Sequence, residues 1–463
     1  MTAPLVCMLS AAHPPADVRV VGKEGAALAS AGWRVMHLCP APARQDASAP
    51  LQETAAPAAL NGRASIASAL VGGAAVGNAF ASDVPSSGAG AESTLATDDT
   101  AARSTPPRPA AAGHVPDSHV PASHAGVAIQ TYRRAPGWRG RLLGIPALAR
   151  RAAATGAAVL HASEPDAWIA AILAARRSGA RVVLDVHEHY PSRLDHRLPR
   201  VLRPLGRAGL RLACRLSARA ADAVVVAKDG LDADFAAPAR TIPVRNYATP
   251  AAVTPRRHAP GPLTLVHLGA LGRSRGAWEM LEALALCPPE TRLRLIGRFT
   301  DGSGEAFSAR ADELGLAGRI DQLGWMPHEA ALQAAASADI GLVLFQPGVE
   351  NHRLALPHKL FDCMLAGLPI IAPAFAEEVA SVVRDAACGL LVPTEDPAAI
   401  AAAIHRLRDP AMRAGMGANG RDAALGRFGW GAEAARLVGL YRRLAPLPAT
   451  VAAPAAPAPL EVA

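Results

Sequence analysis

Strand and helix signals alternate along most of this 463-residue chain, and this alternation limits its possible folds more than any other feature. Short apolar runs of strand type are separated by amphipathic stretches of helical period. In the first half of the chain the runs cover residues 5–10, 33–39, 157–163, 180–189, 221–228 and 241–246. Several are apolar throughout, as expected for parallel strands covered by helices on both faces. The pattern predicts an α/β protein with a doubly wound parallel sheet.

A second set of strand signals follows the Pro-containing segment 248–262, which is typical of a linker between domains. These runs cover residues 263–271, 292–299, 319–326, 339–345, 368–373 and 388–393. Because single cores stop growing at roughly 250 to 300 residues, the chain is expected to form more than one domain. We predict a first domain from 1–40 and 126–250, and a second from 256–425. A C-terminal helix at 426–446 and an unstructured tail at 447–463 complete the prediction.

Residues 41–125 interrupt the first domain with a stretch rich in Ala, Ser, Pro and Gly that contains one aromatic residue, Phe80. Such a composition forms no packed core, so we predict a disordered insertion between two strands. The insertion holds seven acidic residues and four arginines, so the chain's net charge of +8 comes from the rest of the chain. A basic folded body favours an anionic partner.

Several function classes lose their main sequence support. The chain contains no G-x-G-x-x-G, Walker A, G-x-S-x-G or H-E-x-x-H motif. Its six cysteines are scattered without a close pair, which indicates buried thiols in a reducing cytoplasm. We find no apolar run long enough to span a membrane, and the apolar N-terminal segment is typical of a strand rather than a signal peptide. We therefore predict a cytoplasmic protein.

The stretch LPHKLFDCMLAGLPIIAP, residues 356–373, predicts a helix that starts after Pro357 and ends at a Gly-Leu-Pro break. It follows the strand 339–345, so its start lies at the carboxyl edge of the sheet, where ligands of open α/β sheets bind. Its free N–H groups would face a phosphate, and Lys359 would add positive charge. Asp362 could accept hydrogen bonds from ribose hydroxyls. The alternative is a solvated Lys and Asp on an ordinary helix.

The loop LGALGRSRGAW, residues 268–278, follows the first strand of the second domain and contains three glycines. Small residues let the backbone approach a phosphate, and Arg273 or Arg275 can supply a charged fork. An ordinary turn remains the alternative for this loop. Its position at the same sheet edge as Lys359 favours an anion site built from both segments.

These two stretches, together with LGWMPHEAALQAAASADIGLVLF and CGLLVPTEDPAAIAAAI, occur in the order and spacing of a known family. The chain resembles the retaining nucleotide-sugar glycosyltransferases of the GT-B architecture, in particular glycosyltransferase family 4, also called group 1. In the first domain, HPPADVRVVGKEGAALASAGWRV and VVLDVHEHYP agree with it. The resemblance implies two Rossmann-like doubly wound domains that face an interdomain cleft.

By position, the resemblance assigns Arg275 to the donor diphosphate and Asp362 to the ribose. The first of the family's two spaced glutamates would fall at Leu354, so that motif is incomplete here. Glu350 or Asn351 could contact the sugar instead. The predicted donor-binding residues are Gly269, Arg273, Arg275, Glu350, Asn351, Pro357, Lys359 and Asp362. The predicted catalytic residues are His187, Arg275 and Lys359.

In the first domain, His187 lies at the end of the strand RVVLDV, where the family often has a histidine near the transferred sugar. A structural histidine is the alternative. Asp185 is a weaker candidate for the same site. His13 and Asp17, in the loop after the first strand, and Glu188 are predicted to contact the acceptor. For the first two, stabilisation of a turn is the alternative.

The resemblance implies a reaction without a protein general base, in which the leaving phosphate oxygen assists the acceptor hydroxyl. It also implies no metal and no cofactor beyond the nucleotide-sugar co-substrate. We therefore predict a retaining hexosyltransferase-like enzyme acting on a lipid-linked or polysaccharide acceptor. Leu354 leaves open a catalytically silent binding protein, and a nucleotide-sugar epimerase on the same fold is a further alternative.

Eight arginines spaced by three or four residues form a basic stripe between Pro191 and Ala220. They are Arg193, Arg197, Arg200, Arg203, Arg207, Arg211, Arg215 and Arg219. Leucines occupy another side of the same stretch, and Pro199, Pro204 and Gly206 predict a broken helix pair. The stripe suits an anionic membrane surface, which would place the protein at the inner face of the membrane, without nucleic acid as a partner. The alternative is an ordinary solvated face packed by its leucines.

Overall fold

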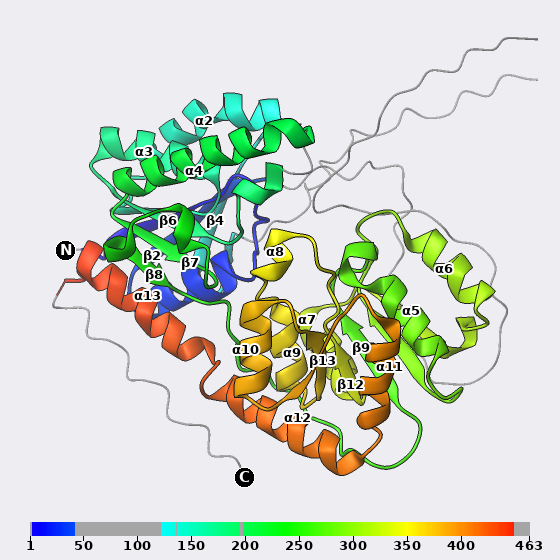
Figure 1. Ribbon diagram of the computed structural model, residues 1–463. Coiled ribbons are helices and arrows are strands. Elements are labelled where there is room, and N and C mark those ends of the chain that lie inside the picture. The colour runs from blue at the N-terminus through cyan, green and yellow to red at the C-terminus, as the bar shows by residue number, and fades with distance from the viewer. Residues whose placement is uncertain (1, 42–121, 136, 195–197, 449–463) are drawn as a thin grey trace, which may run out of the picture. The chain divides into compact units, whose positions relative to one another are not determined.

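The computed structural model describes residues 2–41, 122–135, 137–194 and 198–448. These residues belong to one compact unit with two parallel α/β sheets, labelled in Figure 1. We call residues 2–41 and 122–244, with their sheet, the first lobe, and residues 263–428, with theirs, the second lobe. The predicted architecture of two doubly wound α/β domains is confirmed.

The first lobe contains an eight-stranded sheet in the order β3-β4-β2-β1-β5-β6-β7-β8. Its strands are β1 (Leu5–Leu9), β2 (Arg34–Pro40), β3 (Ser123–His124), β4 (Val127–Tyr132), β5 (Val159–Ala162), β6 (Arg181–Val186), β7 (Ala223–Val226) and β8 (Thr241–Pro243). All neighbours are parallel except β3 and β4. β4 was missed in the sequence, because its burial alternates and its apolar signal is weak.

Helices cover both faces of this sheet. They are η1 (Val20–Gly25, a π-helix), α1 (Ala26–Ser30), α2 (Gly137–Ala154), α3 (Pro165–Ser178) and α4 (Arg203–Ala220). On one face α2, α3 and α4 pack against alternate strand residues such as Leu160 and Leu184 (Figure 1). On the other face η1 and α1 pack against the neighbouring residues of the same strands, such as Val159 and Val183. The period-2 alternation of the strands thus supplies two separate core layers.

The C-terminal helix α13 (Trp430–Leu444) packs on the first lobe, although it follows the second lobe in the chain. Trp33 Nε1 donates a hydrogen bond of 2.9 Å to the carbonyl of Ala445. The Tyr441 hydroxyl lies 2.7 Å from His161 Nδ1. These contacts tie the end of the described chain to its beginning.

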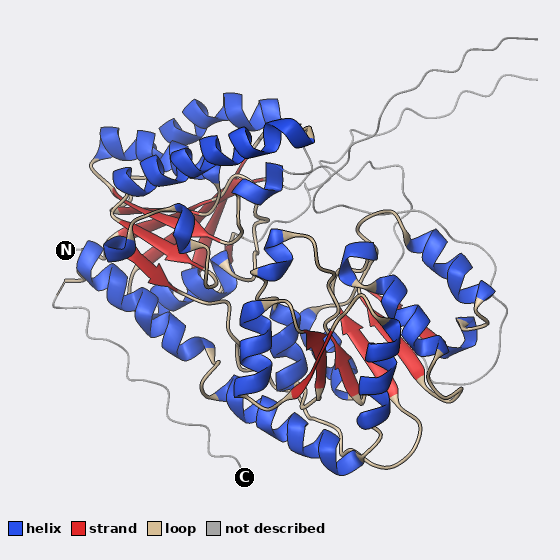
Figure 2. Ribbon diagram, viewed as in Figure 1, coloured by secondary structure: helices blue, strands red, loops and turns tan. Residues whose placement is uncertain are grey.

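The second lobe contains a six-stranded parallel sheet in the order β11-β10-β9-β12-β13-β14, drawn red in Figure 2. Its strands are β9 (Thr264–Leu268), β10 (Arg292–Ile296), β11 (Ile320–Gly324), β12 (Ile340–Leu342), β13 (Ile370–Pro373) and β14 (Gly389–Val392). Its helices are α5 (Ala277–Ala285), α6 (Gly304–Glu313), α7 (His328–Ala336), α8 (Glu350–Arg353), α9 (His358–Leu365), α10 (Glu377–Asp385), α11 (Pro397–Arg406) and α12 (Pro410–Leu425). α5, α6 and α11 share one core layer, and α7, α9 and α10 share the other.

Further predictions concern the cysteines, the insertion and tail, and membrane-spanning helices. All six cysteines are buried and unpaired, as expected. Most of the predicted insertion and tail, residues 42–121 and 449–463, lies outside the described residues, but β3 begins within the last residues of the predicted insertion. Among the described helices, none has the length and apolar character needed to cross a membrane.

Candidate functional site

α9 places Lys359 at the carboxyl edge of the second sheet. Pro357 precedes the helix as its N-cap residue, and Leu360, Phe361 and Met364 anchor it in the core. Lys359 Nζ lies 2.8 Å from Nε2 of His267, a buried residue of β9. Burial and the nearby Arg275 lower the pKa of Lys359 to about 7. Burial and Lys359 also hold the pKa of His267 well below its usual value, so its neutral ring can accept a hydrogen bond from the ammonium.

The glycine loop after β9 comes within contact distance of this ammonium. Gly269 has a φ of +89°, and a Cβ there would lie 4.0 Å from Lys359 Nζ. Gly276 has a φ of +81°, and a Cβ there would lie 2.1 Å from the carbonyl oxygen of Leu344. Gly276 is therefore required by backbone packing rather than by a ligand.

Arg275 ends the short turn Arg273–Arg275 in the same loop and is half-buried. Within the described residues its guanidinium makes no hydrogen bond or ion pair. Burial lowers its pKa, although attraction to Glu188 of the first lobe opposes the shift. Arg275 helps to lower the pKa of Lys359, and among the described residues neither cation forms an ion pair with a carboxylate.

Lys228, which the sequence analysis did not single out, belongs to the same electrostatic group. It follows β7 of the first lobe and is 8% exposed. Burial lowers its pKa, and repulsion from Arg275 adds to the shift, while Glu188 and Glu378 oppose it. The sequence marks Lys228 only by its residue type: of the 47 lysines and arginines, all but three are arginines.

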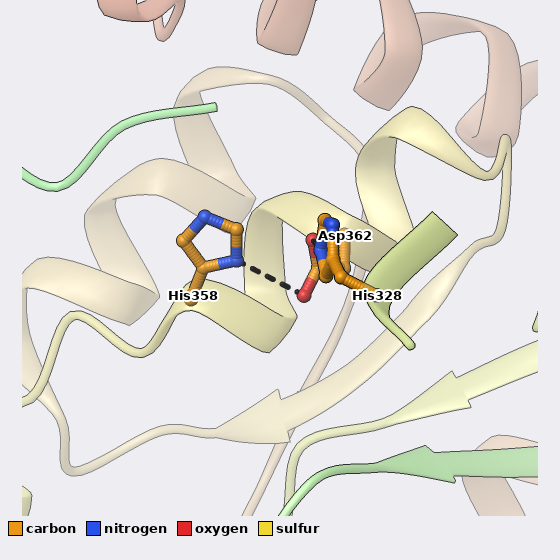
Figure 3. A group of neighbouring side chains, drawn as sticks. All are labelled: His328, His358 and Asp362. Atoms are coloured by element: carbon orange, nitrogen blue, oxygen red, sulfur yellow. Dashed lines mark hydrogen bonds and ion pairs between the residues drawn. The ribbon is translucent and has the colours of Figure 1, made fainter. Parts of the chain in front are cut away.

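Asp362 is buried on α9 and is surrounded by two histidines (Figure 3). His328 Nε2 lies 2.9 Å from Oδ1, and His358 Nδ1 lies 3.1 Å from Oδ2. Burial would raise the pKa of Asp362, but hydrogen bonds from both histidines hold it well below its usual range. The carboxylate is thus ionised and already has partners, whereas the sequence predicted a carboxylate that is open to a ribose.

Three other residues of the predicted donor site have partners within the protein, and so does Leu354. The Arg273 guanidinium lies 3.8 Å from the centroid of the Trp278 ring. Glu350 forms an ion pair of 2.6 Å with Arg353. Asn351 Oδ1 accepts a 2.7 Å hydrogen bond from the backbone N–H of His189 in the first lobe. Leu354 belongs to the apolar cluster of the first lobe, and a Cβ on Gly230 would come within 2.8 Å of its side chain.

Leu354 and Asn351 therefore join the two lobes. The position where the family pattern has a glutamate is occupied here by an apolar contact, which explains why a leucine stands there. Asn351 adds a polar contact one turn earlier. This contact role could not be recognised in the sequence, because both partners come from the first lobe.

The predicted acceptor residues gather at the carboxyl edge of the first sheet. His13 Nδ1 lies 2.9 Å from Asp17 Oδ2, and the His13 ring lies 5.0 Å from the His187 ring. Burial would lower the pKa of His13, but Asp17 and Glu164 raise it to about 9. The Glu164 carboxylate also accepts hydrogen bonds from three backbone N–H groups of this loop, at 2.8, 2.9 and 3.2 Å. The loop is thus held in place around a protonated imidazole.

Asp185 orients His187 through a hydrogen bond between its carboxylate and His187 Nε2. Asp185 is completely buried and also lies 3.1 Å from Arg19 and 3.4 Å from His161. Burial would raise the pKa of Asp185, but His187 and Arg19 hold it well below its usual value. Asp185 is thus better placed to orient His187 than to contact a ligand. Glu188 lies at the surface and pairs with Arg193 at 2.9 Å.

Two groups of described residues bring together three side chains of metal-ligand type: His328, His358 and Asp362, and Glu24, His161 and Asp185. In the first group each imidazole is hydrogen-bonded to the carboxylate. In the second, Arg19 contacts both carboxylates, at 2.7 and 3.1 Å. A cation already provides the counter-charge there, so this group fits an ion-pair network better than a metal.

Comparison with known proteins finds two family matches. Residues 262–409 match the family Glycosyl transferases group 1, and residues 90–244 match Glycosyltransferase Family 4. Together they cover more than half of the chain. The protein is 30% identical over 138 residues to a D-inositol 3-phosphate glycosyltransferase of Acidothermus cellulolyticus, covering 30% of this chain and 29% of that protein. It is 29% identical over 187 residues to a phosphatidyl-myo-inositol mannosyltransferase of Mycobacterium leprae, covering 39% and 47%. The matches span less than half of either relative.

Solved structures share the fold over more of the chain. A sucrose-phosphate synthase of Thermosynechococcus elongatus superposes with a TM-score of 0.64 at 17% identity, covering 95% of this chain and 99% of that one. HepE of Anabaena in complex with UDP gives a TM-score of 0.56 at 17% identity, covering 69% and 87%. These likenesses show the GT-B fold.

Proposed function

Because the chain belongs to the family 4 glycosyltransferases, also called group 1, we propose that it transfers a hexose-type sugar from a nucleotide-sugar donor. The proposed acceptor is lipid-linked or a polysaccharide, and the anomeric configuration is retained. One observation carries the donor class: Arg275 and Lys359 lie at the carboxyl edge of the second sheet without a carboxylate partner among the described residues. A diphosphate supplies the negative charge that these groups lack.

In the proposed reaction, the bond between the anomeric carbon and the donor's phosphate oxygen breaks, and negative charge grows on the leaving diphosphate. Arg275, Lys359 and the N-terminus of α9 stabilise that charge. The acceptor hydroxyl attacks the anomeric carbon from the face that the phosphate leaves, and its proton passes to the phosphate oxygen. His13 and His187 position the acceptor side of this reaction. No step requires a metal or a cofactor besides the donor.

Turnover of a panel of UDP- and GDP-linked hexoses tests this proposal. The purified protein should release the nucleoside diphosphate from at least one donor, and the rate should rise when a lipid or glycan acceptor is added. The name of the Mycobacterium leprae relative suggests phosphatidylinositol as a first lipid to try. Binding of a donor without any turnover across the acceptor panel would instead favour a catalytically silent binding protein.

Asp362 is proposed to bind the ribose by exchanging its histidine partners for hydroxyl groups. Asp362→Ala should weaken UDP binding about tenfold, since hydrogen bonds to a charged group contribute roughly 1.5 to 3 kcal/mol. Binding of 2′,3′-dideoxyuridine diphosphate should change little. Calorimetry measures both, with GDP and its dideoxy form used where GDP binds better. His328→Ala, which removes one histidine but keeps the carboxylate, is the matched control. An equal loss for both nucleotides would contradict the ribose role.

α4 and the turn before it are proposed to contact an anionic membrane. The alternative, a solvated face packed by its leucines, does not fit, because Leu205, Leu212 and Leu216 are 73%, 55% and 53% exposed and Val201 is 85% exposed. The predicted break is only partly correct: a short turn at Arg200–Leu202 precedes a single helix that includes Gly206. Exposed apolar residues beside exposed arginines are typical of an interfacial helix. Arg197 of the stripe lies outside the described residues.

Reversing three charges tests this surface. Arg200→Glu, Arg215→Glu and Arg219→Glu together should weaken binding to phosphatidylglycerol vesicles by at least tenfold, because each basic residue near such a surface contributes about 1 kcal/mol. Flotation with vesicles measures the bound fraction. The control carries Arg384→Glu, Arg406→Glu and Arg408→Glu, three exposed positions of the second lobe with the same change in net charge. Equal losses in both variants would show attraction by net charge alone.

A further inference from the structure

Lys228 is a largely buried residue whose ammonium has no hydrogen-bond or ion-pair partner among the residues that the structure describes. It is 8% exposed. Arg413 shows how the same chain treats a buried cation that serves the fold: its guanidinium donates to the carbonyls of Ala259, Leu407 and Arg408, at 2.6, 2.7 and 3.0 Å. Partial burial of a cation without an ion pair costs free energy, and a bound anion would offset that cost.

The choice of lysine at this position is itself informative. The chain has only three lysines, Lys23, Lys228 and Lys359, and all the other basic residues are arginines. Each of the three has a pKa lowered mainly by burial. Lysine carries a compact point charge, whereas arginine needs room for a planar fork. Exposed sites in this chain use arginine, and lysine occurs where a small ammonium has to fit a buried space.

Lys228 lies where the two lobes meet. The next residue, Asp229, donates its backbone N–H to Glu378 of α10 at 3.0 Å. Gly230, the residue after that, packs against Leu354 of the second lobe. The carboxyl end of β7 is thus held against the second lobe, and Arg275 lies close enough to lower the pKa of Lys228.

We propose that Lys228 is a third cation for the donor's diphosphate, supplied by the first lobe and acting with Arg275 and Lys359 of the second. This inference rests on the proposed nucleotide-sugar donor and adds a residue to its site. The diphosphate of a nucleotide sugar carries two negative charges and gains a third as the sugar leaves, so three cations match the leaving group, whereas a nucleoside monophosphate carries less charge. The donor would therefore be bound by both lobes at once, with its diphosphate between them.

The test compares nucleoside diphosphate with monophosphate binding by calorimetry, using UDP and UMP, or GDP and GMP where the guanine pair binds better. Lys228→Met removes the charge and keeps an unbranched chain of similar length. It should weaken diphosphate binding about tenfold or more and change monophosphate binding much less, since it removes one charge-assisted hydrogen bond. The ratio of the diphosphate to the monophosphate dissociation constant should therefore rise.

Lys23→Met is the matched control. Lys23 is also a buried lysine of the first lobe, but its ammonium already donates to Asn246 Oδ1 at 2.8 Å and to the Tyr247 carbonyl at 2.6 Å. Its substitution should leave the diphosphate-to-monophosphate ratio unchanged. An unchanged ratio in Lys228→Met, with diphosphate binding to the wild type intact, would overturn the role of Lys228 alone. Failure of the wild type to bind any nucleoside diphosphate would overturn both this inference and the proposed donor class.

Discussion

Lys359→Met is expected to lower kcat/KM for the sugar donor by roughly 100- to 1,000-fold, the range found when one preorganised group that stabilises developing charge is removed. Lys359 is held by α9 and lies 2.8 Å from His267 Nε2, so its ammonium needs little rearrangement to meet a leaving phosphate. The loss should appear mainly in kcat, because the negative charge on the diphosphate increases as the bond to the sugar breaks. Steady-state kinetics with the best donor of the panel measures both parameters.

The same substitution is expected to leave the free protein as stable as the wild type or more stable. Methionine fills the space of the lysine stem and removes a partly buried cation whose pKa burial has lowered to about 7. Thermal unfolding without ligand measures this directly. If Lys359 serves function at a cost in stability, the substituted protein should lose activity and have a higher Tm. A lower Tm with activity lost in proportion would mean that Lys359 serves the fold rather than the donor.

Donor affinity is expected to fall by up to about tenfold per pH unit above pH 7, and by up to roughly 100-fold between pH 7 and 9. Lys359 loses its proton in the free protein as the pH passes its pKa of about 7, whereas a bound diphosphate favours the charged form. Binding above pH 7 must therefore take up a proton. Calorimetry in two buffers of different ionisation enthalpy measures that uptake at each pH.

The stability of the free protein should change with pH in the opposite direction. The pKa of Lys359 is lowered from 10.5 in the ordinary group to about 7 in the fold, so the unfolded chain binds more protons between these values. Stability contributed by this group therefore rises with pH across that window. Lys359→Met should flatten the pH dependence of donor affinity and that of stability. Proton uptake that persists in this variant would assign the titration to another group, such as Lys228.

Much of the fold was predictable because local patterns carry it. Apolar runs with helical stretches between them indicated both parallel sheets, and Pro357 with the Gly-Leu-Pro break bounded α9. β4 was missed because its burial alternates, and the exposure of the leucines on α4 was not foreseen. Amphipathic spacing shows which residues share a face of a helix. It does not show whether another element covers that face.

The sequence by itself determined the two α/β lobes, the helix that carries Lys359 and the glycine loop that carries Arg275, because these depend on spacing within short segments. Only the tertiary structure decided which side chains the site residues contact. It placed His328 and His358 on Asp362, Leu354 against the first lobe, and Lys228 near enough to Arg275 for its pKa to be lowered. The physical reason is that charge, burial and hydrogen bonding depend on which distant residues meet. That is set by how the sheets and helices pack.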